Sequence, residues 1–109
     1  VSRRLDVLVE VHDEVEIDQA LAAGASIIGV NNRDLDTLEV DPSRALRLRP
    51  RIPADVVSVA ESGVSSRDDG RRIEDAGFDA VLIGEALVTS SDPAMTLMDL
   101  MGQAAEVSR

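Results

Sequence analysis

The sequence predicts an α/β fold built from four consecutive strand–helix units with parallel strands. Short apolar runs rich in valine and isoleucine alternate along the 109 residues with segments of helical pattern. Glycine or proline separates these segments, and the connections between them are short. Strand–helix units in such succession form parallel sheets with right-handed crossovers. We therefore expect residues 1–109 to form one domain.

The first unit begins with the apolar stretch LDVLVEV at 5–11, typical of a strand that is covered on both faces. The period of two in a strand places Glu10 and His12 on the same face. Asp13 then predicts a helix start, with Glu16 three residues later at the capping-box position. A glycine after LAA predicts the end of this helix.

The second strand is expected to start at Ala25 and to end in the polar run GVNNRDL. Asp41 followed by Pro42 predicts the next helix, with the aspartate as N-cap and the proline in the first helical position. Pro50 is expected to end this helix, because proline removes a backbone donor.

The third strand is predicted at 56–60, and a helix starting at Ser65 and closed by Gly77 follows it. The fourth strand is DAVLIGEAL at 79–87, and a second aspartate–proline pair, at 92–93, predicts the last helix. Two architectures satisfy four such units, a small open sheet or part of a barrel. Four strands are half of the eight in a closed (β/α) barrel, and the two end strands are apolar enough that we expect their edges to be covered.

Composition excludes several classes of protein. The formal net charge is −10, all eleven basic residues are arginine, and Phe78 is the single aromatic residue. Such a chain lacks the basic surface and stacking platforms of nucleic-acid binding. The chain has no cysteine, no apolar run near the ~20 residues of a membrane span and no signal-peptide pattern at its start. We expect a soluble cytoplasmic protein without disulfides or thiolate metal sites.

Polar residues stand at the carboxyl ends of the predicted strands. Glu10, Asn31 and Glu61 end the first three, and in a parallel barrel such ends converge on one mouth. Two carboxylates and an amide facing a common space suit acid–base chemistry on a polar substrate. The alternative is that both carboxylates pair with Arg33 at the rim or are simply solvated.

Glycine-containing turns after the third and fourth strands, ESGVSS and LIGEAL, form a second signal. Gly63 and Gly84 would let backbone N–H groups approach a phosphate, although both could simply serve tight turns. His12, the single histidine, is expected to be a hydrogen-bonding rim residue rather than an acid or base. No group of residues has the spacing of a metal site.

Four motifs in this order resemble the C-terminal half of the indole-3-glycerol-phosphate synthase family. They cover nearly the whole chain, and VEVH followed by GVNNRDL is the specific part. The motifs are VEVHDE at 9–14, IGVNNRDLDTLEVD at 28–41, VAESGV at 59–64 and VLIGEALV at 81–88.

The resemblance implies a TIM-type (β/α)8 barrel, of which this chain would be strands five to eight. It implies decarboxylation and ring closure of 1-(2-carboxyphenylamino)-1-deoxyribulose 5-phosphate in tryptophan biosynthesis, without a cofactor or metal. Glu10 would be a general acid–base residue, Asn31 would contact substrate, and Glu61 would orient sugar hydroxyls and a catalytic lysine. Substrate and phosphate binding would fall to Arg33, Ser62, Gly63, Leu82 and Gly84.

The chain departs from the family pattern because it contains no lysine. In the family, catalytic lysines lie on strands one and three, and one of them protonates the substrate carbonyl. We therefore expect the isolated chain to be inactive and to need either a missing N-terminal half-barrel or a second copy of itself as partner. The alternatives are a self-associating half-barrel that only binds phosphate, and a non-catalytic α/β assembly domain.

Overall fold

The structure is a computed structural model that describes residues 5–83, 91–92 and 94–95. Within these residues, four parallel strands form one sheet in the order of the chain. They are β1 (Leu8–Val11), β2 (Ile27–Asn31), β3 (Val57–Glu61) and β4 (Ala80–Leu82). The predicted class, a parallel α/β fold of strand–helix units, is confirmed. Residues 84–87 of the predicted fourth strand lie outside the described residues, and so does the last helix predicted after 92–93, apart from 94 and 95.

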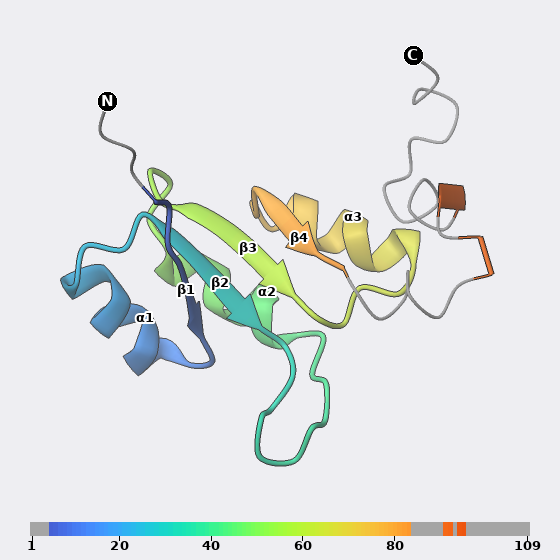
Figure 1. The fold of residues 1–109 in the computed structure, drawn as a ribbon, viewed down its shortest axis with the longest axis horizontal. Helices are drawn as coiled ribbons and strands as arrows, with labels where there is room; N and C mark the ends of the chain where they lie inside the picture. Colours follow the sequence, from blue (N-terminus) through green and yellow to red (C-terminus); the bar gives the residue numbers. More distant parts are fainter. Residues whose placement is uncertain (1–4, 84–90, 93, 96–109) are drawn as a thin grey trace.

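The helices between these strands are α1, α2 and α3, and a 3-10 turn, η1, extends α2. Their bounds are α1 Glu14–Ala22, α2 Arg44–Leu48, η1 Arg49–Arg51 and α3 Arg67–Asp75. Figure 1 shows the four strand arrows side by side and pointing the same way, with α2 behind them. The carboxyl ends of the strands therefore lie along one edge of the sheet.

The start of α1 is as predicted, with one difference in the cap. The Asp13 carboxylate accepts a hydrogen bond from the backbone N–H of Glu16 at 2.8 Å. The Glu16 carboxylate, however, accepts from the backbone N–H of His12 at 2.6 Å. Glu16 thereby fixes the residue that links β1 to α1.

Two predicted helix starts are wrong by one or more residues. The residues Asp41 and Pro42 form a turn before α2 rather than its first positions, because the Asp41 carboxylate accepts from the backbone and hydroxyl of Ser43. In α3 the N-cap is Ser66 rather than Ser65, since its side chain accepts from the N–H of Asp69. Pro50 lies inside η1 and does not end the helical stretch at once.

The core lies between the sheet and the helices. Alternation along β2 and β3 turns Ile28, Val30 and Ala60 towards the helices, where all three are fully buried. The core residues on the helices and connections are Ile17, Ala20, Ala45, Leu48, Ile52, Val56, Val64, Ile73 and Phe78, and β1 contributes Val11.

The opposite face of the sheet is open in the part of the chain that the structure describes. The side chains of Leu8, Val57 and Leu82 are 44%, 44% and 56% exposed there. The expectation that the first strand is covered on both faces is therefore wrong for the described residues, because one face of the sheet is left uncovered. A sheet face of this kind is the inner surface of a barrel when further strands close it.

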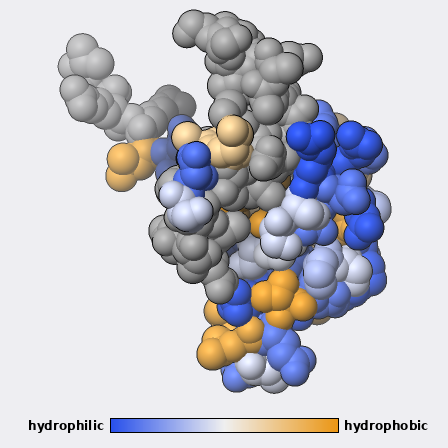
Figure 2. Space-filling model, turned by 90° about the vertical axis from the view of Figure 1, so that its right-hand side faces the viewer, coloured by the Kyte–Doolittle hydropathy of each residue, from blue (hydrophilic) through white to orange (hydrophobic). Residues whose placement is uncertain are grey.

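The loop between β2 and α2 projects beyond the carboxyl edge of the sheet (Figure 1). The Asp34 carboxylate orders it by accepting from the backbone N–H groups of Asp36 and Thr37 at 2.8 and 3.1 Å. Leu35 and Leu38 in this loop are 59% and 62% exposed, and Figure 2 shows apolar groups at the lower end of the molecule, where the loop lies. In the described part of the chain, no helix has the length and apolar character to cross a membrane.

Candidate acid–base site at the carboxyl edge of the sheet

The structure brings Glu10, Asn31 and Glu61 together at the carboxyl edge of the sheet. Asn31 and Glu61 are direct neighbours in the register of β2 and β3, and Glu10 lies beside Gly29 in the register of β1 and β2. The Glu10 carboxyl lies close enough to the side chains of Glu61 and Asn31 for both to affect its pKa. The convergence predicted from the strand ends is thus present in the geometry.

The two carboxyl groups differ in environment. The Glu61 residue is 4% exposed, and its buried Oε2 atom has no N–H or hydroxyl donor among the described residues. Two carboxylates without a donor between them repel each other, so the contact between Glu61 and Glu10 is favourable only when they share a proton.

Burial and the neighbouring Glu10 carboxyl raise the pKa of Glu61 from 4.5 to about 7. The hydrogen bond with Glu61 lowers the pKa of Glu10, with smaller contributions in the same direction from Asn31 and His12 and an opposing one from burial. Of the two carboxyl groups, Glu61 therefore keeps its proton to the higher pH. Carboxyl pairs with separated pKa values are characteristic of acid–base sites.

Gly29 provides the space that the Glu61 carboxyl occupies. A Cβ atom on Gly29 would overlap with Glu61 Oε2 and would lie 3.1 Å from both Glu61 Cδ and Leu8 Cδ1. The carboxyl group thus lies across the backbone of β2 at a position where only glycine leaves room. The sequence suggests this role only through a glycine in the middle of an apolar strand.

Replacing Gly29 with alanine is expected to push the Glu61 carboxyl out of this position and away from Glu10. The pKa of Glu61 should then fall from about 7 towards its ordinary value of 4.5, because the carboxyl gains solvent and loses its charged neighbour. An NMR titration of the side-chain carboxyl carbons of the glutamates measures this directly. An unchanged titration of Glu61 in the folded variant would contradict the assigned packing.

The turn after β3 adds Ser62 to the site. Ser62 has a φ of 67° and Gly63 a φ of 77°, so two consecutive residues adopt the left-handed region. For a residue with a side chain this conformation is strained, and such strain occurs most often at functional positions. The Ser62 hydroxyl donates to Asn31 Oδ1 at 3.1 Å, and the backbone N–H of Arg33 donates to the same oxygen at 2.9 Å.

Asn32 is a buried residue of this edge that the sequence did not single out. It is 1% exposed, its Oδ1 atom accepts from the N–H of Ala45 at 2.8 Å, and its Nδ2 atom donates to the carbonyl of Ser62 at 3.0 Å. Ala45 lies in the first turn of α2, whose own N-cap Ser43 makes no side-chain cap hydrogen bond. Asn32, directly after β2, therefore caps α2 and fixes the turn after β3.

The other predicted site residues lie in different parts of the structure. Arg33 donates from Nη1 to the carbonyl of Leu38 at 2.8 Å and so contributes to the β2–α2 loop. Leu82 pairs in register with Glu61 and lies on the open face beside it. Gly84 lies outside the described residues. Within the ranges that the structure covers, no group of three or more His, Asp or Glu side chains is arranged to hold a metal ion.

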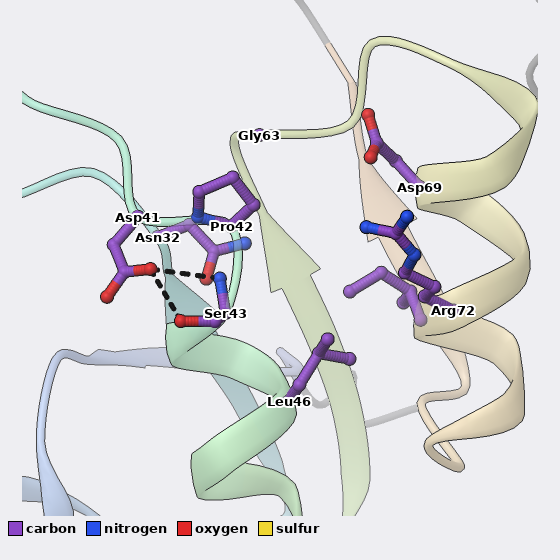
Figure 3. Close-up of a pocket in the computed structure, with 9 residues that line it drawn as sticks. Asn32, Asp41, Pro42, Ser43, Leu46, Gly63, Asp69 and Arg72 are labelled. Atoms are coloured by element: carbon purple, nitrogen blue, oxygen red, sulfur yellow. Dashed lines mark hydrogen bonds between the residues drawn. The ribbon is translucent and has the colours of Figure 1, made fainter.

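A pocket of about 250 Å³ lies on the helix side of the sheet (Figure 3). Asp69 and Arg72 of α3 face α2 across it, and the turn at Gly63 borders it. The full lining is Asn32, Asp41, Pro42, Ser43, Leu46, Gly63, Asp69, Arg72 and Ile73. It contains neither Glu10 nor Glu61, so it is separate from the acid–base site.

Parallel strand–helix units in chain order, with Glu10, Asn31 and Glu61 together at the carboxyl ends of the strands, define a half-barrel of the α/β class. The model of the indole-3-glycerol phosphate synthase family matches residues 1–100. The chain belongs to this family.

Curated relatives named indole-3-glycerol phosphate synthase share about half of their aligned residues with the chain. Identity is 53% over 104 residues with indole-3-glycerol phosphate synthase of Mycolicibacterium vanbaalenii, covering 95% of the chain and 38% of the relative. It is 53% over 88 residues with the protein of Chlorobium phaeovibrioides, covering 81% and 34%. The chain thus spans little more than a third of the length of these relatives.

Solved structures confirm the fold and its extent. The chain matches thiamine phosphate pyrophosphorylase from Pyrococcus furiosus with a TM-score of 0.72 at 19% identity, over 96% of the chain and 51% of that protein. A structure described as native KDPGal matches with a TM-score of 0.68 at 20% identity, over 94% and 49%. At this identity the likeness shows the fold alone, and it is a likeness to half of each structure.

Proposed function

We propose that the chain forms strands five to eight of an indole-3-glycerol-phosphate synthase barrel and contributes the carboxyl pair of its active site. The substrate is 1-(2-carboxyphenylamino)-1-deoxyribulose 5-phosphate, and the products are indole-3-glycerol phosphate, CO₂ and water. The reaction takes place in the cytoplasm without a cofactor. The observation that supports this proposal is the convergence of Glu10, Asn31 and the buried Glu61 at the carboxyl edge of the sheet.

The separated pKa values give the two carboxyl groups different tasks. Glu10, ionised near neutral pH, accepts a proton during ring closure and dehydration. Glu61, whose pKa is raised to about 7, donates a hydrogen bond to a sugar hydroxyl in its protonated form. Asn31 contacts the substrate from between them, and its Oδ1 atom is held in place by Ser62 and Arg33.

Phosphate binding is assigned to the backbone of the Ser62–Gly63 turn, together with Gly84. The Ser62 hydroxyl already donates to Asn31, so the backbone N–H groups of the turn are the donors that we assign to the phosphate. Arg33 and Leu82 border the substrate from the β2–α2 loop and from β4.

The chain contains no lysine, so it lacks the residue type to which the family resemblance assigns protonation of the substrate carbonyl. A complementary half with that lysine is therefore required for turnover. The 109-residue chain alone is expected to be inactive, and its mixture with a separately produced N-terminal half of a close relative is expected to form indole-3-glycerol phosphate. The product is followed by its fluorescence, with a full-length relative as positive control. Absence of product from a mixture that forms a stable complex would contradict the proposal.

The open sheet face favours a second candidate, a homodimer of half-barrels that binds phosphate but does not catalyse. Leu8, Val57 and Leu82 would be buried between two copies of this face. Against this stands the net charge of −10 on each copy, which opposes association. Light scattering at micromolar concentration separates the two, since a monomer excludes the homodimer.

A further inference from the structure

His12 lies between the acid–base pair and the first turn of α1. Its Nδ1 atom is 3.2 Å from Glu16 Oε1, and its backbone N–H donates to the same oxygen at 2.6 Å. Its Nε2 atom is 3.6 Å from Glu10 Oε2. The imidazole therefore bridges a carboxylate of α1 and a carboxylate of β1.

This arrangement fixes which nitrogen carries hydrogen. A carboxylate oxygen can only accept, so Nδ1 must donate its hydrogen to Glu16. In the neutral ring Nε2 would then present a lone pair to Glu10, and this buried atom makes no hydrogen bond in the structure. A hydrogen on Nε2 removes this repulsion and leaves an imidazolium between two carboxylates.

We propose that His12, held by Glu16, is a positioning residue for the acid–base pair: it orients the Glu10 carboxylate and keeps it the ionised member, so that the shared proton stays on Glu61. The inference extends the proposed function, because the pair it concerns is the one assigned to the reaction. His12 itself lies beside the pair and is not assigned contact with substrate.

The other charged groups around this cluster are compatible with this role. Glu61 approaches Glu10 from β3, and Asp34 of the β2–α2 loop is close enough to His12 and Arg44 to interact electrostatically with both. The Arg44 guanidinium is engaged with the main-chain carbonyl of Asn31 at 3.2 Å. The cluster is thus mostly acidic, and a cation at His12 offsets part of this charge.

Replacing His12 with glutamine tests the role in the complete 109-residue chain, with the glutamate carboxyl carbons labelled for an NMR titration. Loss of the ring beside the Glu10 carboxylate is expected to raise the lower titration step of the Glu10–Glu61 pair and to bring the two steps closer together. Glu16→Gln should move the lower step in the same direction by a smaller amount, since its amide still holds the ring but lacks the charge.

The matched control is Glu14→Gln, which removes an equal charge from the same turn of α1. The Glu14 carboxylate forms its ion pair with Arg51, at 3.3 Å. The titration of the Glu10–Glu61 pair should therefore remain as in the parent chain. An unchanged lower step in folded His12→Gln, or an equal change in Glu14→Gln, would overturn the positioning role. This result is independent of turnover, so inactivity of the reconstituted barrel would count against the proposed function and not against the role of His12.

Discussion

Replacing Asn32 with alanine is expected to lower the free energy of unfolding of the chain by about 3 kcal/mol, because one buried and one partly buried backbone group lose their partners. These groups are the N–H of Ala45 and the carbonyl of Ser62, which the Asn32 amide bridges. Denaturation in urea, followed by circular dichroism, measures the change as a lower midpoint. A variant that no longer unfolds cooperatively would indicate a loss at least as large.

The control for this prediction is the adjacent Asn31→Ala. The Asn31 side-chain oxygen also accepts two hydrogen bonds, from Arg33 and Ser62, but these donors are only partly buried and can reach water in the variant. The loss of stability should be clearly smaller than for Asn32→Ala. If Asn31→Ala lost as much stability as Asn32→Ala or more, the cap that Asn32 provides for α2 would not be the main source of the effect.

The fold class could be predicted from the sequence because it follows from local patterns. Apolar runs with a period of two, and the glycines and prolines between them, give the parallel strand order that the structure shows. The same patterns placed Glu10, Asn31 and Glu61 at one edge, because the carboxyl ends of parallel strands coincide. These predictions need no knowledge of contacts between distant residues.

The cap of α2 shows where such reasoning fails. An aspartate followed by proline is the usual local signal for a helix start, and it led to Asp41 as N-cap. The side chain that binds the first turn comes instead from Asn32, thirteen residues before Ala45. Asn31 and Asn32 are identical in chemistry and adjacent in sequence, so only their opposite faces on the sheet distinguish a site residue from a structural one.

The sequence alone also could not predict which of the two carboxyl groups has the raised pKa. Two strand-end glutamates could equally have been solvated or paired with Arg33. Burial of Glu61 across Gly29 is what distinguishes the two carboxyl groups, because it removes solvent from Glu61 and places it beside Glu10.

Replacing Glu61 with glutamine is expected to remove a pH dependence of stability between pH 5 and pH 8. The pKa of Glu61 is about 7 in the folded chain, against 4.5 as its ordinary value. Between these two values the folded state binds more protons than the unfolded state, so the stability of the parent chain falls as the pH rises and becomes constant above pH 7. The expected fall is about 2 kcal/mol, less than the full conversion of the pKa difference, because solvent at the rim screens part of it.

Urea denaturation at pH 5 and at pH 8 measures this effect, with Glu39→Gln as the control. Glu39 lies in the exposed β2–α2 loop, so its replacement makes the same chemical change from glutamate to glutamine without touching the pair. The lowered pKa values of Glu10 and Asp41 add stability that is lost only at more acidic pH, outside this interval. If Glu61→Gln and Glu39→Gln lose the same stability between the two pH values, Glu61 is not the protonated member of the pair, and the division of acid and base tasks between Glu61 and Glu10 fails with it.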